Sequence, residues 1–292
     1  SNQNKLSEFY EELKRLNIKI QRPDINKCYA DFRADVDNFY YALGSIKSVG
    51  YEAISNIVDE RLKNGDFKSI SDFINRVNPK DINKLQLEGL IKAGAFDSIE
   101  SNRNSLLSSV PNLILKSKNI FENKLINQID LFEENNNKDE ELIIKIEDWN
   151  FEERLSKEFE SLGFFISDHP INQFKEFFQA YNIVHYSDFI SDNSLNQSNI
   201  ASTILKVQEK KTSKGNSYAI IKLTDLSGVF ELFIFSDLLE INRDIIKEGN
   251  SVMLSLKKNT IDDLNRFKRI NVLKIVSMNN LLDQPIKNIE FS

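Results

Sequence analysis

The sequence reads Leu90-Ile91-Lys92-Ala93-Gly94-Ala95-Phe96-Asp97 where a helical pattern that begins near Asn83 ends in a glycine turn. An earlier turn, Ile46-Lys47-Ser48-Val49-Gly50, leads into a helical pattern that runs from Tyr51 to Val58. Each turn therefore joins short helical segments. Two such units in one stretch of chain predict paired helix-hairpin-helix elements between residues 45 and 100.

A helix-hairpin-helix element can bind DNA without reading its sequence. The N–H groups of the turn and the positive end of the next helix face a backbone phosphate and position the protein on the duplex. The alternative is that Gly50 and Gly94 only separate the helices of a bundle, and the pattern does not decide between the two. The residues predicted to contact duplex phosphates are Lys47, Ser48, Val49, Gly50, Lys92, Ala93 and Gly94.

The composition limits the classes of protein to which the chain can belong. Its 292 residues carry 38 Lys+Arg against 44 Asp+Glu, so a surface for nucleic acid must be local. One cysteine (Cys28) and two histidines exclude a disulfide scaffold and argue against a structural zinc site. No apolar run reaches membrane-spanning length, and we expect a soluble, cytoplasmic protein without a membrane partner.

The last third of the chain changes from a helical to a strand-like period. A helical segment at 236–247 follows the third of five short strands, which matches the partly open barrel called the OB-fold. We therefore predict a multidomain α+β fold, with a mostly helical N-terminal part and a five-stranded OB-fold β-barrel. The expected strands are 201–208, 217–224, 229–235, 251–256 and 269–276.

In an OB-fold, the second and third strands and the first hairpin loop bind single-stranded nucleic acid. Phe230, Leu232 and Ile234 alternate with Phe233 and Phe235, so one set forms the core, but alternation does not tell which. The alternative is that the lysines belong to a solvated hairpin without a ligand and that the aromatic side chains pack in the interior of the barrel. The residues predicted to contact a single strand are Lys206, Lys210, Lys211, Lys214 and Lys222 through phosphate, and Tyr218 and Phe233 through stacking.

A Leu-Phe pair in the middle of the chain stands just before a polar, asparagine-rich run. Such an apolar tip on a polar tether is typical of a short docking peptide, in which a glutamine amide sets the register. The alternative is the last core turn of a helix. The candidate docking residues are Gln128, Ile129, Asp130, Leu131 and Phe132.

Three carboxylates, Asp31, Asp35 and Asp37, raise the hypothesis of a magnesium-dependent nuclease. Asp35-Val36-Asp37-Asn38 is better interpreted as a polar connection between strands. No carboxylate in a comparable strand elsewhere in the sequence could complete a metal site with Asp35 and Asp37. We therefore assign no catalytic residue and no metal site. A protein-interaction scaffold, in which the barrel grips a protein, stays open as a further alternative.

In its motifs the chain resembles the C-terminal half of the bacterial DNA polymerase III alpha subunits, the C family of replicative polymerases. The resemblance covers 22–276 in collinear order. It lies in Pro23-Asp24-Ile25-Asn26, in the two turns quoted above, in Leu162-Gly163-Phe164-Phe165-Ile166-Ser167-Asp168-His169-Pro170, and in Lys210-Lys211-Thr212-Ser213-Lys214-Gly215-Asn216. Ser48 stands where the family usually has glycine, so a positive φ at that turn would fit Ser48 poorly.

The resemblance implies a division of labour along the chain. It implies the end of a fingers domain (1–44), a tandem helix-hairpin-helix domain (45–100), a helix with clamp-binding peptide and linker (101–142), a helical connector (143–198), an OB domain (199–280) and a tail (281–292). The implied function is the DNA-binding and sliding-clamp-binding portion of a replicative DNA polymerase, a nucleotidyltransferase. The family's catalytic aspartates and magnesium lie in an upstream palm domain, so this portion is expected to be non-catalytic and without a cofactor. Its expected partners are duplex and single-stranded DNA, the sliding clamp and other replicase subunits.

Overall fold

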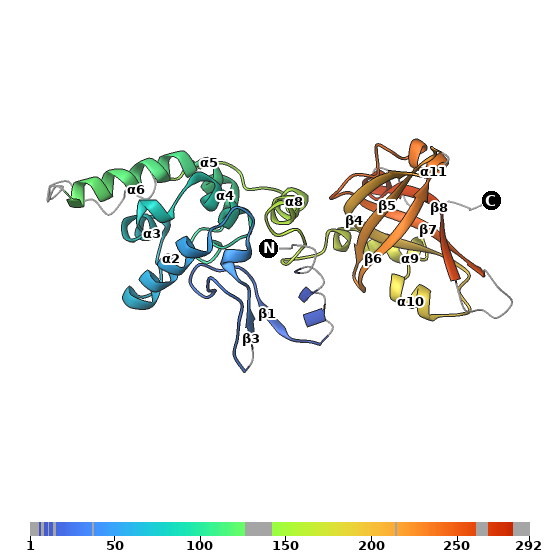
Figure 1. Cartoon of the computed structure of the whole chain (residues 1–292), viewed down its shortest axis with the longest axis horizontal. Helices are drawn as coiled ribbons and strands as arrows, with labels where there is room; N and C mark the ends of the chain where they lie inside the picture. The colour runs from blue at the N-terminus through green and yellow to red at the C-terminus, as the bar shows by residue number, and fades with distance from the viewer. Residues whose placement is uncertain are drawn as a thin grey trace. The chain divides into compact units, whose positions relative to one another are not determined.

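The computed structural model divides into two compact units, Ser1–Ser167 and Asp168–Ser292 (Figure 1). It describes residues 6, 9–10, 12–13, 16–36, 38–125, 142–213, 215–260 and 268–282. The predicted docking residues 128–132, and with them Lys214 and Asp37, lie outside the described residues. The finer division into six parts stays a prediction.

Unit 1 begins with a small sheet of order β1-β3-β2, made by β1 (Lys19–Gln21), β2 (Arg33–Ala34) and β3 (Asn38–Tyr40). β1 runs parallel to β3, and β2 runs antiparallel to it. The carboxylate of Asp35 organises the connection between β2 and β3. It accepts hydrogen bonds from the Asn38 N–H at 2.7 Å and from the Tyr40 hydroxyl at 2.8 Å. Asp35 is therefore part of a polar connection between strands, as predicted, and the described residues contain no group of three metal-ligating side chains.

The rest of unit 1 is helical. Side-chain caps start three of its helices: Ser69 accepts from the Asp72 N–H, Asn83 forms a capping box with Gln86, and Asn150 accepts from the Glu153 N–H. None of the described helices is long and apolar enough to span a membrane. The elements are η1 (Leu43–Ser45), α2 (Tyr51–Asn64), α3 (Ile70–Arg76), η2 (Pro79–Asp81), α4 (Lys84–Lys92), α5 (Arg103–Ser108), α6 (Val110–Leu125) and α8 (Phe151–Leu162).

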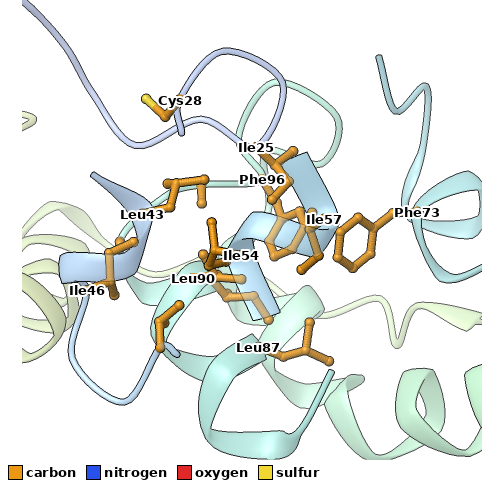
Figure 2. Close-up of a cluster of buried hydrophobic side chains, with 14 of the residues drawn as sticks. Ile25, Cys28, Leu43, Ile46, Ile54, Ile57, Phe73, Leu87, Leu90 and Phe96 are labelled. Carbon is orange, nitrogen blue, oxygen red and sulfur yellow. The ribbon is translucent and has the colours of Figure 1, made fainter. Parts of the chain in front are cut away.

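One apolar core joins these helices. Ile54 and Ile57 of α2 pack with Leu87 and Leu90 of α4 and with Phe73 of α3, and all five side chains are buried (Figure 2). The helical spacing of the apolar residues puts them on one face of each helix. The core therefore holds the two predicted hairpin turns in place from the inside.

Unit 2 contains the five-stranded sheet. The strands are antiparallel in the order β6-β5-β4-β7-β8, and α11 follows the third strand as predicted, although it is shorter than predicted and ends at Ile241. The helix ends there because the backbone of Asn242, with a φ of −111° and a ψ of 15°, leaves the helical conformation; its side chain also donates a hydrogen bond to the Leu238 carbonyl. The strands are β4 (Gln197–Lys211), β5 (Ser217–Asp225), β6 (Gly228–Phe235), β7 (Ser251–Thr260) and β8 (Lys268–Ser277), and the remaining elements are η3 (Pro170–Phe174), α9 (Lys175–Ala180), α10 (Tyr186–Ser191), α11 (Ser236–Ile241) and α12 (Asn279–Leu282).

The longest strand, β4, connects the two halves of this sheet. Its first part, up to Thr203, pairs with β7, and its second part, from Thr203 to Lys211, pairs with β5. The pairing with β5 shifts between Ile204 and Lys206, which leaves Leu205 as the extra residue of a bulge. The edge strands β6 and β8 approach each other, with no ladder between them among the described residues. The sheet is a curled, partly open barrel.

The structure decides which side chains of β6 face the core. Phe230, Leu232 and Ile234 are buried, whereas Phe233 and Phe235 are 49% and 46% exposed. On the outside of the barrel, Phe174 and Phe177 cover the part of the sheet where Met253 lies. The remaining outer surface, formed by β4, β5 and β6, carries polar and aromatic side chains.

Candidate nucleic-acid interface

The first hairpin turn is an exposed loop with buried apolar anchors. Ile46 and Val49 are buried, and the Val49 N–H donates to the Ile46 carbonyl at 3.1 Å. Between them, Lys47 and Ser48 are exposed, as is Gly50 after them. Ser48 has a φ of 65°, so the turn takes the left-handed conformation, which glycine adopts more readily than serine.

The turn leads directly into α2, a helix of 14 residues. Gly50 is its N-cap and makes no side-chain cap hydrogen bond, because it has no side chain to offer. The first N–H groups of α2 therefore receive no side-chain cap from the N-cap residue, and they follow Lys47 and Ser48 closely along the chain. A close contact from the other side supports this turn, since a Cβ at Gly89 of α4 would lie 2.8 Å from the Lys47 carbonyl oxygen.

The second hairpin turn has a different environment. Ala93 and Ala95 are almost fully buried, and the N–H groups of Gly94 and Ala95 donate to the carbonyls of Ile91 and Leu90. The backbone groups of this turn are thus used within the helix end.

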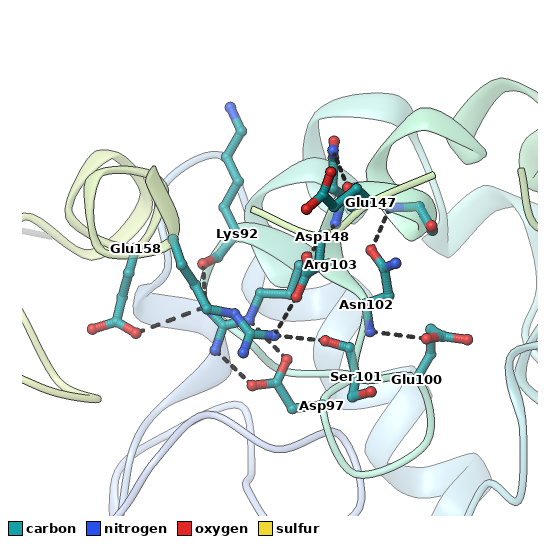
Figure 3. A network of polar contacts seen from close by, with 12 residues as sticks. Lys92, Asp97, Glu100, Ser101, Asn102, Arg103, Glu147, Asp148 and Glu158 are labelled. Carbon is teal, nitrogen blue, oxygen red and sulfur yellow. Dashed lines mark hydrogen bonds and ion pairs between the residues drawn. The ribbon is translucent and has the colours of Figure 1, made fainter. Parts of the chain in front are cut away.

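Arg103 covers the second turn from outside. Its guanidinium binds both carboxylate oxygens of Asp97, at 2.8 and 2.6 Å, and donates to the Lys92 carbonyl at 3.2 Å (Figure 3). The Nη1 atom also lies 3.8 Å from the fully buried carboxylate of Glu158 on α8. The pKa of Arg103 is raised: burial alone would lower it, and the bonds to Asp97 and the nearby carboxylates more than compensate. This side chain is a structural clamp between α4, α5 and α8.

The predicted duplex contacts therefore differ in their exposure to solvent. Lys47, Ser48 and Gly50 lie on the surface, whereas Val49, Ala93 and Gly94 are buried. The Lys92 ammonium extends away from the Arg103 guanidinium (Figure 3) and forms an ion pair with Glu160 at 2.8 Å.

On unit 2, five of the predicted single-strand contacts lie on the outer surface of β4, β5 and β6, which we call the outer face: Lys206, Lys210, Tyr218, Lys222 and Phe233. Strand register places Lys206 opposite Lys222 and Lys210 opposite Tyr218. Tyr218 and Phe233 lie in a near-parallel arrangement, with ring centroids 6.5 Å apart and an interplanar angle of 26°. Lys211 is exposed at the end of β4, where the hairpin loop begins.

Phe235, on the outer face, and Arg269, beside it, were not among the predicted contacts. Phe235 is opposite Tyr218 in register, and the guanidinium carbon of Arg269 on β8 lies 4.9 Å from its ring centroid. The alternation along β6 could have pointed to Phe235, because it has the same parity as Phe233. Nothing local in the sequence points to Arg269, since only the curl of the sheet brings β8 to β6.

Comparisons with known proteins agree with this architecture. Residues 17–106 match the family model described as the helix-hairpin-helix motif. The chain is 31% identical over 296 residues to DNA polymerase III subunit alpha of Borreliella burgdorferi, an alignment that covers 99% of the chain and 25% of the relative. The protein of that name from Campylobacter jejuni is 34% identical over 86% of the chain and 21% of its own length, and that from Caulobacter vibrioides is 28% identical over 91% and 24%.

These relatives share one name, and the chain spans about a quarter of their length. The motif match falls on the part of unit 1 that contains both hairpin turns. The chain therefore belongs, along its aligned residues, to the family of DNA polymerase III alpha subunits.

Proposed function

We propose that this chain is a DNA-binding portion of a replicative DNA polymerase, with one surface for duplex and another for single-stranded DNA. The observation that carries the proposal is the outer face of unit 2, where exposed aromatic rings stand among lysines. Tyr218 and Phe233 offer π-faces to bases, and Lys206, Lys210 and Lys222 offer charge to phosphates. This combination is the usual basis of single-strand binding without sequence preference.

The duplex surface is the first hairpin turn. Exposed Lys47 and Ser48 lie beside the N-terminus of α2, where N–H groups and the helix dipole favour an anion. The match to the helix-hairpin-helix motif supports this assignment. Binding of this kind would hold the duplex by its backbone, independently of its sequence.

We further propose that Gln128, Ile129, Asp130, Leu131 and Phe132 dock on the sliding clamp. The support is the apolar pair before a polar tether and the resemblance of the chain to the polymerase family. A tethered peptide raises the effective concentration of its partner, so a weak contact can keep the polymerase on DNA. In this role the portion works in the cytoplasm with other replicase subunits, without a catalytic site or cofactor of its own.

Fluorescence anisotropy with a labelled single-stranded oligonucleotide tests the outer face. Replacing Lys210, Lys211 and Lys214 by alanine should weaken binding and flatten its salt dependence, because each lost phosphate contact lowers the slope by about 0.7 for a single strand. A matched triple variant at Lys63, Lys175 and Lys247, three exposed lysines elsewhere on the chain, should bind as the wild type does. Equal affinity of all three proteins would reject the single-strand site.

A clamp pull-down tests the docking peptide separately. The double variant Leu131→Ala with Phe132→Ala should lose the clamp, whereas Asn136→Ala with Asn137→Ala in the polar tether should keep it. Retention of the clamp by the first variant would show that the docking residues are assigned wrongly, and it would leave the DNA surfaces unaffected.

A further inference from the structure

An acidic side chain lies among three lysines beside the duplex surface. The Glu160 carboxylate, near the end of α8, is 2.8 Å from the Lys92 ammonium and 3.8 Å from that of Lys157. The end of α8 also contacts the first hairpin turn, because the Lys47 N–H donates to the Ser161 carbonyl at 3.0 Å. We call Lys47, Lys92, Lys157 and Glu160 the Glu160 cluster. It brings together α4, α8 and the first hairpin turn.

The charges of the Glu160 cluster do not balance. Two ammonium groups, those of Lys92 and Lys157, contact one carboxylate, and Lys47 on the adjoining turn adds a third positive charge. The four side chains of the cluster therefore carry more positive than negative charge. The pKa of Glu160 is lowered, first by the hydrogen bond from Lys92 and then by the charges of Lys92, Lys157 and Lys47. Lys47 is exposed to solvent, and its backbone N–H is hydrogen-bonded to the residue that follows Glu160.

The carboxylate is also accessible. The Glu160 side chain is 51% exposed and that of Lys157 is 33% exposed, whereas that of Lys92 is 16% exposed. A half-exposed ion pair gains little from its own geometry, because water screens it. A phosphate with several charged oxygens can bind more than one ammonium at once, and it can take the place of such a carboxylate.

We propose that Lys47, Lys92 and Lys157 form a phosphate-binding site for the backbone of duplex DNA, and that Glu160 occupies it until a phosphate displaces the carboxylate. This inference rests on the proposed duplex surface and extends it from the first turn to α8. Lys157 becomes a DNA contact that neither hairpin supplies. Glu160 acts as an internal competitor, which weakens binding of the portion to DNA at large.

The test measures duplex affinity of the whole chain across a series of salt concentrations. Glu160→Gln removes the competing charge and keeps the side chain's shape. We expect several-fold tighter binding at low salt and a plot of log K against log salt that is steeper by about 0.9, as for one added phosphate contact. The control is Glu153→Gln, which removes an equal charge from the exposed first turn of the same helix. Its slope should equal that of the wild type.

A second substitution separates local from general effects. Lys157→Ala should cancel the gain in affinity and slope when it is combined with Glu160→Gln. An unchanged slope for Glu160→Gln, or an equal gain from Glu153→Gln, overturns the inference while the duplex surface stands. If the Lys47→Ala variant binds duplex DNA as tightly as the wild type does, both the duplex surface and the inference are overturned. Fluorescence of Trp149, the single tryptophan, checks that each variant is folded.

Discussion

The guanidinium of Arg103 occupies the space in which a side chain at Gly94 would have to lie. A Cβ built at Gly94 would be 2.6 Å from the Arg103 guanidinium carbon, and the φ of Gly94 is 78°. Gly94 is thus required by its backbone conformation and by its neighbour. Arg103 in turn joins Asp97 to the end of α4. This pair, and not an open anion site, is the main feature of the second hairpin turn.

Gly94→Ala should destabilise unit 1 by more than backbone strain alone. A positive φ costs an alanine about 1–3 kcal/mol, and displacement of Arg103 adds to that cost. Gly65→Ala is the comparison in which only the backbone is strained, because Gly65 has a φ of 86° and a ψ of 173° and no heavy atom beyond its chain neighbours lies within 4 Å of its Cβ position. Urea unfolding followed by Trp149 fluorescence should show a loss of stability for both variants and a larger loss for Gly94→Ala. Equal losses would mean that Arg103 moves aside freely.

Position 48 should prefer glycine. Ser48 holds a φ of 65°, a conformation that costs an L-residue about 1–2 kcal/mol, whereas glycine adopts it readily at some cost in chain entropy. We expect Ser48→Gly to leave the free energy of unfolding unchanged or to raise it by up to about 1 kcal/mol. Ser48→Val should lower it, because a β-branched residue fits this conformation poorly. The same urea experiment measures both, and a more stable valine variant would contradict the turn geometry.

Phe233→Ala should weaken single-strand binding without unfolding the barrel. The ring is half-exposed beside Tyr218, so its loss leaves the core of Leu232 and Ile234 intact. Stacking on an aromatic ring contributes about 1–3 kcal/mol per base, which corresponds to a loss of roughly 5- to 150-fold in affinity. Ile241→Ala is the control, since Ile241 is a large apolar side chain on α11 that is 81% exposed. Anisotropy with a short oligonucleotide distinguishes the two variants.

Asp35→Asn should change the pKa of Tyr40. We expect no magnesium-dependent nuclease activity either before or after this substitution. The Tyr40 hydroxyl donates to Asp35, and this bond raises the pKa of Tyr40 because it stabilises the protonated phenol. The bond is present at neutral pH and is lost as the pH rises through the raised pKa of Tyr40. Its removal should therefore shift the ultraviolet titration of Tyr40 to lower pH. Magnesium-dependent cleavage of DNA that disappears in this variant would instead revive the nuclease hypothesis.

Cys28 should not react with alkylating reagents while unit 1 is folded. Burial raises the pKa of its thiol to about 11, and the side chain has no exposed surface. At about pH 8 the thiolate is therefore scarce and shielded. Iodoacetamide followed by mass spectrometry should label the chain in urea and not in its absence. Rapid labelling of the native protein would show that the segment around Cys28 opens.

The helices and strands were predictable because their signals are local. Ser69, Asn83 and Asn150 start helices by accepting hydrogen bonds from the N–H three residues on. The strand periods and the helix after the third strand likewise identified the five-stranded sheet.

The candidate sites were less predictable, because they depend on contacts between distant residues. The glycine turn at Gly94 was evident, but nothing in its spacing shows that Arg103 covers it. Both faces of β6 carry phenylalanine, so the sequence does not tell which face is buried. Only the packed core shows that Phe230 faces inward. Glu160 has no local signal either, because Lys92 reaches it from 68 residues away.

The position of β4 also bears on how this barrel can vary among relatives. The strand changes its pairing partner at Thr203, so a single residue inserted there would turn the side chains of one half of β4 to the opposite face of the sheet relative to the other half. The bulge at Leu205 already absorbs one such extra residue. Lengthening or trimming the outer strands alters one ladder each, and natural variation in length should accordingly accumulate at the rims of the barrel and spare its middle strand.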